Sequence, residues 1–132
     1  MNNSNQTLTI KEQLQACRSK EETFKTLVTL SKILQRLSSE EKTDENKMKG
    51  CESAVWLIVE ESNGIRHFNA DSDAKLMRGV LVAILSLVEG KAAKDIQQMN
   101  LKVELAELNL SSYLTSSRTN GVLAILSQLQ QP

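Results

Sequence analysis

Hydrophobic residues recur at helical spacing in the first forty positions of the chain. A Thr-x-x-Glu sequence at residues 9–12 and a Ser-x-x-Glu sequence at residues 19–22 have the form of capping boxes, which begin helices. They predict a short helix to about Cys17 and a longer helix to about Leu37. The apolar face of the longer helix would hold Phe24, Leu27, Val28, Leu30, Ile33, Leu34 and Leu37.

A β-hairpin is predicted in the middle of the chain. Residues 54–60 are apolar and β-branched between polar flanks, as in a buried strand, and residues 65–70 alternate as a second strand would. Asn-Gly at residues 63–64 is a strong signal for the turn between them. We expect Glu60 to pair with Ile65 across the hairpin.

The most hydrophobic stretch follows the hairpin. Asp-Ser-Asp at residues 71–73 has the form of a helix cap, and the predicted helix runs to about Glu89, where Gly90 is a candidate stop. It is apolar on nearly every face, which is typical of a buried helix, so we expect it at the centre of the core. Gly79 lies inside it, and we expect close packing against the sheet at this position.

The rest of the chain is predicted to form helices that cover the sheet. Short helices are expected over residues 92–99 and 101–108, and a final helix from Thr115 to about Gln130. Its apolar face would hold Val122, Leu123, Ile125, Leu126 and Leu129. We therefore expect one α+β domain over residues 1–132, with a small antiparallel sheet, N-terminal helices and a buried central helix. Residues 1–8 are expected to be disordered.

The charge balance and hydropathy of the chain indicate which classes of partner, and which location, to expect. The chain carries 16 basic and 16 acidic residues and has no block of like charge. We therefore expect neither a nucleic acid nor a membrane surface as a partner. The longest nearly unbroken apolar run, residues 80–88, is shorter than the roughly 20 residues that span a bilayer, and the N-terminus lacks the pattern of a secretory signal. A cytoplasmic location is the expectation.

Two cysteines and one histidine, with no Cys-x-x-Cys, leave little scope for a disulfide framework or a zinc site. In a reducing compartment both thiols would be free. Neither of the common glycine-rich phosphate-binding loops is present, and we expect no resident cofactor or metal. We interpret Cys17, near the end of the first helix, as a packing residue.

Cys51 has the sequence context of a reactive thiol. It directly follows Gly50, which permits a turn that other residues resist, and it precedes the first predicted strand. A cysteine reacts as its thiolate, which nearby positive charge or a helix N-terminus favours. The candidate cations are Lys47, Lys49 and Arg118, and the start of the central helix is predicted nearby. The alternative is that these cations are ordinary surface charges.

Other residues around Cys51 allow more than one interpretation. Trp56 is either core or the wall of an apolar pocket that would raise the pKa of the thiol. The polar run over residues 38–47 is either a solvated connection or a docking rim. His67 lies roughly 20 Å along the strand at ~3.3 Å per residue, too far to serve as a base. A single thiol without a base favours a group carrier over a stand-alone enzyme.

Three separated segments share residue patterns with a known family. They read N-x-M-x-G-C-x-S-x-V-W at residues 46–56, D-S-D-A followed by R-G at residues 71–79, and L-T-x-S-R-x-x-G at residues 114–121. Their order and spacing, over nearly the whole chain, resemble those of the SufE-type sulfur-acceptor proteins, including the CsdE branch. The choice between the two branches stays open.

The resemblance implies a helix-flanked antiparallel sheet similar to that of the IscU scaffold, with the thiol on a loop. It implies a partner, a pyridoxal-phosphate cysteine desulfurase of the SufS or CsdA type, whose persulfide passes its outer sulfur to Cys51. The pyridoxal phosphate belongs to that partner. Cys51 would hand the sulfur to an iron–sulfur scaffold complex of the SufBCD type. The residues implied to support Cys51 are Gly50, Ser53, Trp56, Asp73, Arg78 and Arg118.

Two other functions are kept as alternatives, and a homodimer is left open. An IscU-like iron–sulfur scaffold needs several ligands that converge on iron, usually thiolates, and this chain offers one placed thiol. A thiol redox protein or a purely structural interaction domain is the second alternative, although no Cys-x-x-Cys favours the redox version.

Overall fold

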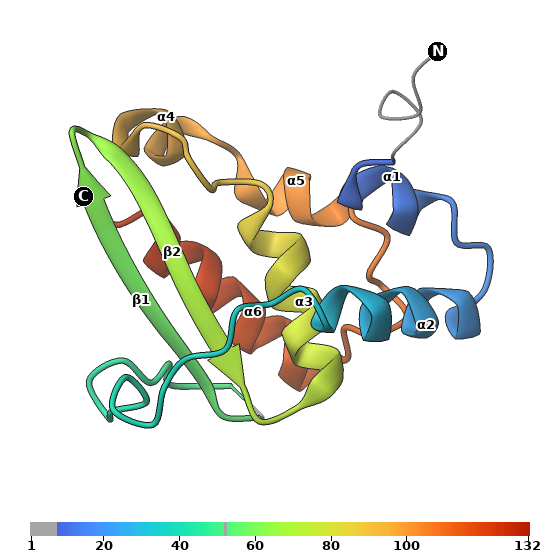
Figure 1. Ribbon diagram of the computed structural model, residues 1–132. Helices are drawn as coiled ribbons and strands as arrows, with labels where there is room; N and C mark the ends of the chain where they lie inside the picture. The colour runs from blue at the N-terminus through green and yellow to red at the C-terminus, as the bar shows by residue number, and fades with distance from the viewer. Residues whose placement is uncertain (1–7, 52) are drawn as a thin grey trace, which may run out of the picture.

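A long two-stranded hairpin stands beside a group of helices in the computed structural model, which describes residues 8–51 and 53–132 (Figure 1). The elements, in chain order, are α1 (Ile10–Gln15), α2 (Lys20–Ser31), β1 (Val55–Ser62), β2 (Ile65–Ser72), α3 (Lys75–Leu85), α4 (Ala93–Gln98), α5 (Leu101–Ala106) and α6 (Ser116–Leu129). The α+β class is confirmed. The expected disorder of residues 1–8 falls, apart from Leu8, outside the described residues. Among the described helices, none has the length and hydropathy needed to cross a bilayer.

The N-terminal helices begin where the sequence predicts. Thr9 and Glu12 form a complete capping box at α1, and the Ser19 side chain accepts a hydrogen bond at the start of α2. The predicted end of the second helix at Leu37 is wrong, because α2 ends at Ser31. The backbone N–H of Leu37 donates instead to a carboxylate on β2, so the chain has left the helix by that point.

The hairpin has the predicted turn but a different register. Ser62, rather than Glu60, pairs with Ile65. Asn63 and Gly64, with φ values of 55° and 80°, form a two-residue loop by themselves, so the strands pair right up to the turn. Because the predicted register is off by two residues, each side chain still points to the expected face.

The central helix is shorter than predicted at both ends. Asp71 and Ser72 belong to β2 and do not cap α3, which begins at Lys75 with Ala74 as its N-cap. The helix ends at Leu85, and the chain turns before Gly90. The expected packing of Gly79 against the sheet is also wrong, since a Cβ at this position would clash with the backbone of Leu27 in α2.

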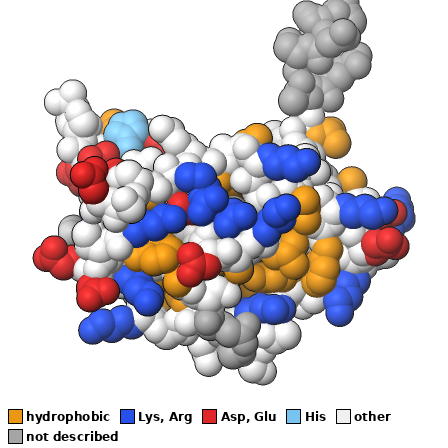
Figure 2. Space-filling model, turned by 60° about the horizontal axis from the view of Figure 1, so that its bottom comes forward, with side chains coloured by type: hydrophobic (Ala, Val, Ile, Leu, Met, Phe, Trp, Pro, Cys, Tyr) orange, Lys and Arg blue, Asp and Glu red, His pale blue; other side chains and the backbone are white. Residues whose placement is uncertain are grey.

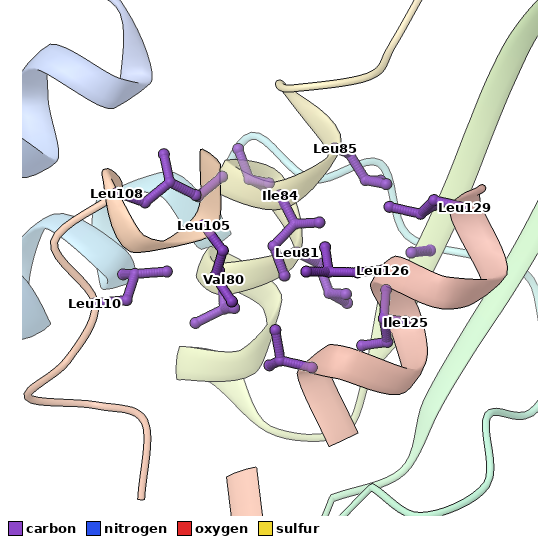
Figure 3. Packing of buried hydrophobic residues seen from close by; sticks show 14 of the residues in the cluster. Val80, Leu81, Ile84, Leu85, Leu105, Leu108, Leu110, Ile125, Leu126 and Leu129 are labelled. Carbon is purple, nitrogen blue, oxygen red and sulfur yellow. The ribbon is translucent and has the colours of Figure 1, made fainter. Parts of the chain in front are cut away.

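The core lies around α3, as its hydropathy predicts. Side chains of α3 point toward those of α6 and of the 105–110 segment (Figure 3). Buried contributors from these three segments include Val80, Leu81, Ile84, Leu85, Leu105, Leu108, Leu110, Ile125, Leu126 and Leu129. The hairpin and the helices are therefore held on one apolar centre, and the segment between α2 and β1 is left to pass around the open end of the hairpin (Figure 1).

Candidate functional site

Cys51 lies where the chain reverses direction into β1. Residues 46–48 run alongside β1, because the Met48 N–H donates to the Val55 carbonyl at 2.7 Å and the Leu57 N–H donates to the Asn46 carbonyl at 2.8 Å. The reversal begins at Gly50, whose φ of +84° is in the left-handed region that favours glycine. The predicted bend before Cys51 is therefore present.

The Cys51 thiol is half-buried against the last helix. Its Sγ lies 3.8 Å from the carbonyl oxygen of Gly121 in α6, within reach of a weak S–H donation. Burial raises the pKa of the Cys51 thiol. This is the direction expected of apolar burial and the opposite of that expected from stabilising cations or a helix N-terminus, so the thiol is held in its neutral form.

An open hollow adjoins the thiol. It has a volume of about 530 Å³ and is lined by Asp44, Lys47, Met48, Lys49, Gly50 and Cys51. The two lysines predicted as cations therefore stand beside Cys51, and among the described residues Asp44 stands there with them. The third, Arg118, stacks on the Tyr113 ring at 4.6 Å from its centroid and donates to the Tyr113 carbonyl at 3.2 Å.

A buried carboxylate holds the segment that precedes Cys51. Asp71 is fully buried, and its oxygens accept from Arg36 Nε at 2.6 Å, from the Leu37 N–H at 3.1 Å and from the Ser72 N–H at 2.8 Å, with Lys42 Nζ at 3.3 Å. Burial raises the pKa of Asp71, but these four donors outweigh it and the net pKa is lowered. Lys42 thus ties the polar run over residues 38–47 to the hairpin, while most of the run is exposed to solvent.

Trp56 supports this anchored segment and does not line the hollow beside Cys51. It is half-buried, and Lys42 Nζ lies 5.3 Å from its ring centroid. Its cross-strand partner is Asp71. One lysine therefore contacts both members of this strand pair, through a cation–π contact with one and an ion pair with the other.

Three predicted supporting residues gather at the turn from β2 to α3. Arg78 donates to the backbone carbonyls of Ser72 at 2.9 Å and Asp73 at 3.3 Å. The Asp73 N–H and the Ser72 hydroxyl both donate to the Ala54 carbonyl, at 3.3 Å and 2.6 Å. Ser53, beside Ala54, is half-buried. The contacts of Ser72, Asp73 and Arg78 fix the backbone at Ala54, directly before β1.

The remaining candidates lie away from Cys51. His67 is exposed, pairs with Glu60 across the hairpin, and approaches Glu89 at 2.9 Å, in agreement with its interpretation as a plain strand residue. Cys17 is half-buried, with Sγ 3.2 Å from the Thr26 hydroxyl, as expected of a packing residue. In the described part of the chain, no group of three or more His, Cys, Asp and Glu side chains is placed to hold a metal ion.

The face that bears the Cys51 segment is the bottom of Figure 1, and Figure 2 shows it from below. Lys and Arg side chains are spread across it among hydrophobic side chains, and acidic side chains lie mainly toward its ends. The chain is neutral overall, and in this view most of the Lys and Arg side chains lie apart from the acidic side chains.

Sequence reasoning missed two residues of the site. Asp71 has the local pattern of a helix cap, and its partners Arg36 and Lys42 are too far along the chain for a local pattern to reveal them. Gly121 closes the L-T-x-S-R-x-x-G segment, and that glycine was the available signal. Its contact with Cys51 spans 70 residues of sequence.

The fold is α+β, and its candidate site is a half-buried thiol on a turn between an extended segment and a hairpin, packed on the final helix. Residues 8–132 match the SufE family model, described as an Fe–S metabolism associated domain, and the chain belongs to this family. It is 36% identical over 106 residues to the sulfur acceptor protein CsdE of Escherichia coli K12, a match that covers 80% of this chain and 72% of that protein.

Two further likenesses agree with this assignment. An uncharacterised SufE-like protein of Rhizobium etli is 32% identical over 115 residues, 84% of this chain and 78% of that protein. The solution structure of a hypothetical protein from Thermus thermophilus superposes with a TM-score of 0.71 at 14% identity, over 92% of this chain and 90% of that one. The second likeness concerns the fold alone.

Proposed function

We propose that this protein accepts sulfur from a cysteine desulfurase onto Cys51 and thereby activates that enzyme. Membership of the SufE family and the likeness to the sulfur acceptor CsdE support this function. The observation that carries it is the placement of Cys51 on a glycine turn, half-buried beside a hollow that Lys47 and Lys49 line. A thiol in that position is shielded at rest and close enough to the surface to meet a partner.

The transfer exchanges one sulfur–sulfur bond for another. The Cys51 thiolate attacks the outer sulfur of the partner's persulfide, the partner's S–S bond breaks, and the partner leaves as a thiolate. Cys51 then carries the persulfide, and the proton that it gave up balances the thiolate released, so no electron donor is needed. Because burial raises the pKa of the Cys51 thiol, contact that lifts it from α6 would increase the thiolate fraction.

The same proposal includes the type of desulfurase, the final sulfur acceptor and the location of the protein. The desulfurase is of the SufS or CsdA type and holds the pyridoxal phosphate, and the final acceptor is an iron–sulfur scaffold complex of the SufBCD type. The chain acts as one domain, in the cytoplasm, where free thiols such as Cys17 and Cys51 persist. Lys47 and Lys49 beside Cys51 would meet acidic residues of the desulfurase.

Mass spectrometry tests the acceptor role directly. The protein is incubated with a cysteine desulfurase and L-cysteine, and the expected product carries additional sulfur on the peptide that contains Cys51. Cys51→Ala should abolish both this modification and the stimulation of the desulfurase, whereas Cys17→Ser should retain both. Absence of sulfur on Cys51, or full stimulation by Cys51→Ala, would reject the proposal.

A further inference from the structure

The last helix approaches Cys51 at a glycine. Gly121 is buried in the interior of α6, where glycine is less favourable to a helix than alanine would be. Its backbone is helical, so a left-handed conformation is not the reason for glycine here. Another feature of the structure must account for it.

Close contact with Cys51 is that feature. A Cβ placed on Gly121 would lie 3.0 Å from the Cα, 3.2 Å from the Sγ and 3.4 Å from the Cβ of Cys51. The first two distances are shorter than ordinary van der Waals separation, and the three nearest atoms all belong to one residue. By contrast, Gly50, Gly64 and Gly90 have positive φ and open space around them.

We propose that Gly121 is a positioning residue whose bare surface on α6 forms the seat of the Cys51 thiol. The seat holds the sulfur against the helix and so sets how far it is shielded from solvent. The seat adds a structural detail to the sulfur-acceptor proposal. Only its biological role, which is to keep the thiol unreactive until a desulfurase docks, rests on that proposal. The contact itself stands on the geometry.

The geometry also indicates which side yields if the seat is filled. Val122 and Ile125 are fully buried and anchor α6 in the core. No described residue lies within 4 Å of a Cβ placed on Gly50, so the chain directly before Cys51 is not packed against other atoms on that side. A methyl group on residue 121 should therefore displace the thiol outward and leave the helix in place.

Alkylation kinetics test the seat without any desulfurase. In a Cys17→Ser background only Cys51 reacts, and its rate with iodoacetamide is measured across pH for the parent and for Gly121→Ala. We expect the variant to react faster at neutral pH and to reach half its maximal rate at a lower pH. Each unit by which the thiol pKa falls raises the thiolate fraction roughly tenfold, but a less basic thiolate is a weaker nucleophile, so the rate should rise roughly threefold per unit. Ser127→Ala, on the exposed part of the same helix, should react as the parent does. A folded Gly121→Ala protein with the parent's rate and pH profile would overturn the proposal.

A second measurement covers the case in which Gly121→Ala does not fold. In the ¹⁵N spectrum of the Cys17→Ser protein, alkylation of Cys51 should shift the Gly121 amide signal and leave that of Gly90 in place. An unmoved Gly121 signal would overturn the seat. Since neither experiment involves sulfur transfer, failure of the seat would leave the acceptor function standing, and failure of sulfur transfer would leave the seat standing.

Discussion

Cys51 and Asp71 are both at least partly removed from solvent, but the pKa of Cys51 is raised and the pKa of Asp71 is lowered. The Cys51 thiol is partly desolvated and gains only a weak contact with the Gly121 carbonyl, so its pKa rises. The Asp71 carboxylate is fully desolvated, but its donors are strong and close, so its pKa falls. One group is therefore kept neutral near the surface, while the other is kept charged in the interior.

Because its pKa is raised, the Cys51 thiol should be alkylated slowly in the folded protein. In the Cys17→Ser background, the alkylation rate should rise with pH and reach half its maximum at a higher pH than for the same chain unfolded in urea. The reason is that desolvation favours the protonated form only in the folded state. Mass spectrometry of timed samples gives the rates. An equal or lower midpoint in the folded protein would contradict the prediction.

Asp71→Asn should destabilise the fold by about 2–3 kcal/mol, the upper part of the range for hydrogen bonds to a charged group. The amide nitrogen would have to face an N–H donor of Leu37 or Ser72. Because folding lowers the pKa of Asp71, its stabilisation is present above the unfolded pKa and is lost as the pH falls through the folded value.

Urea unfolding of the two proteins at neutral and acidic pH measures this difference, which should shrink below about pH 4. Asp73→Asn is the matched control, since Asp73 is exposed and stands in the same Asp-Ser-Asp sequence. It should change stability by less than about 0.5 kcal/mol. Equal effects of the two substitutions, or a difference independent of pH, would show that the Asp71 contacts contribute no special stability.

At the scale of elements, α2 and α3 meet at one point without a side chain between them. Gly79 of α3 packs directly on the backbone of Leu27 in α2. Such close approach requires a residue without a Cβ, and it lets the buried helix α3 lie tightly against its neighbour. The weak helix propensity of glycine is the cost of this geometry.

Gly79→Ala should therefore lower stability by about 1–3 kcal/mol through overpacking, despite the better helix propensity of alanine. The substitution cannot be relieved by a side-chain rotation, because the contact is with backbone atoms. Gly64→Ala separates the two effects of glycine, since at φ +80° with no neighbour it introduces backbone strain alone. Urea midpoints of both variants provide the measurement. A Gly79→Ala protein as stable as the parent would rule out the clash.

Sequence signals predict elements well where the determining contacts are local. The capping box at Thr9 and the Asn63-Gly64 turn are of this kind. The start of α6 after Thr115 is also as predicted, although the Thr115 side chain makes no capping hydrogen bond. The predicted end of α2 and the predicted start of α3 are both wrong. Leu37 and Asp71 bond to each other across 34 residues, so neither lies in the helix that its own neighbours favour, although α2 already ends at Ser31.

The same distinction between local and distant contacts applies to the candidate functional site. The local Gly50-Cys51 pair predicted the bend that carries the thiol, and of the candidate cations Lys47 and Lys49 line the hollow beside it. The neighbours that set its reactivity come from distant positions, because the glycine of α6 that contacts Cys51 lies 70 residues away in sequence. Hydrophobic spacing places that helix in the core but does not specify which of its residues faces the thiol.

For the molecule as a whole, α6 links the two ends of the hairpin. Near its start, Gly121 contacts Cys51 at the open end. At its other end, the Leu129 carbonyl accepts from Arg66 at 3.0 Å, close to the hairpin turn, and Arg66 is only 5% exposed. The short turn that carries the thiol therefore lies at the open end of a hairpin that α6 contacts near both of its ends (Figure 1).

The carboxylate of Asp71 is shared by two segments of the chain, and this predicts that the two segments open together. The N–H groups of Leu37 and Ser72 both end on it, although one belongs to the segment after α2 and the other to β2. Protection of both from deuterium should therefore be lost in a single opening event, with closely matched protection factors after division by the intrinsic exchange rates. NMR-detected exchange would reveal this, and protection factors that differ widely would mean that the two segments open independently.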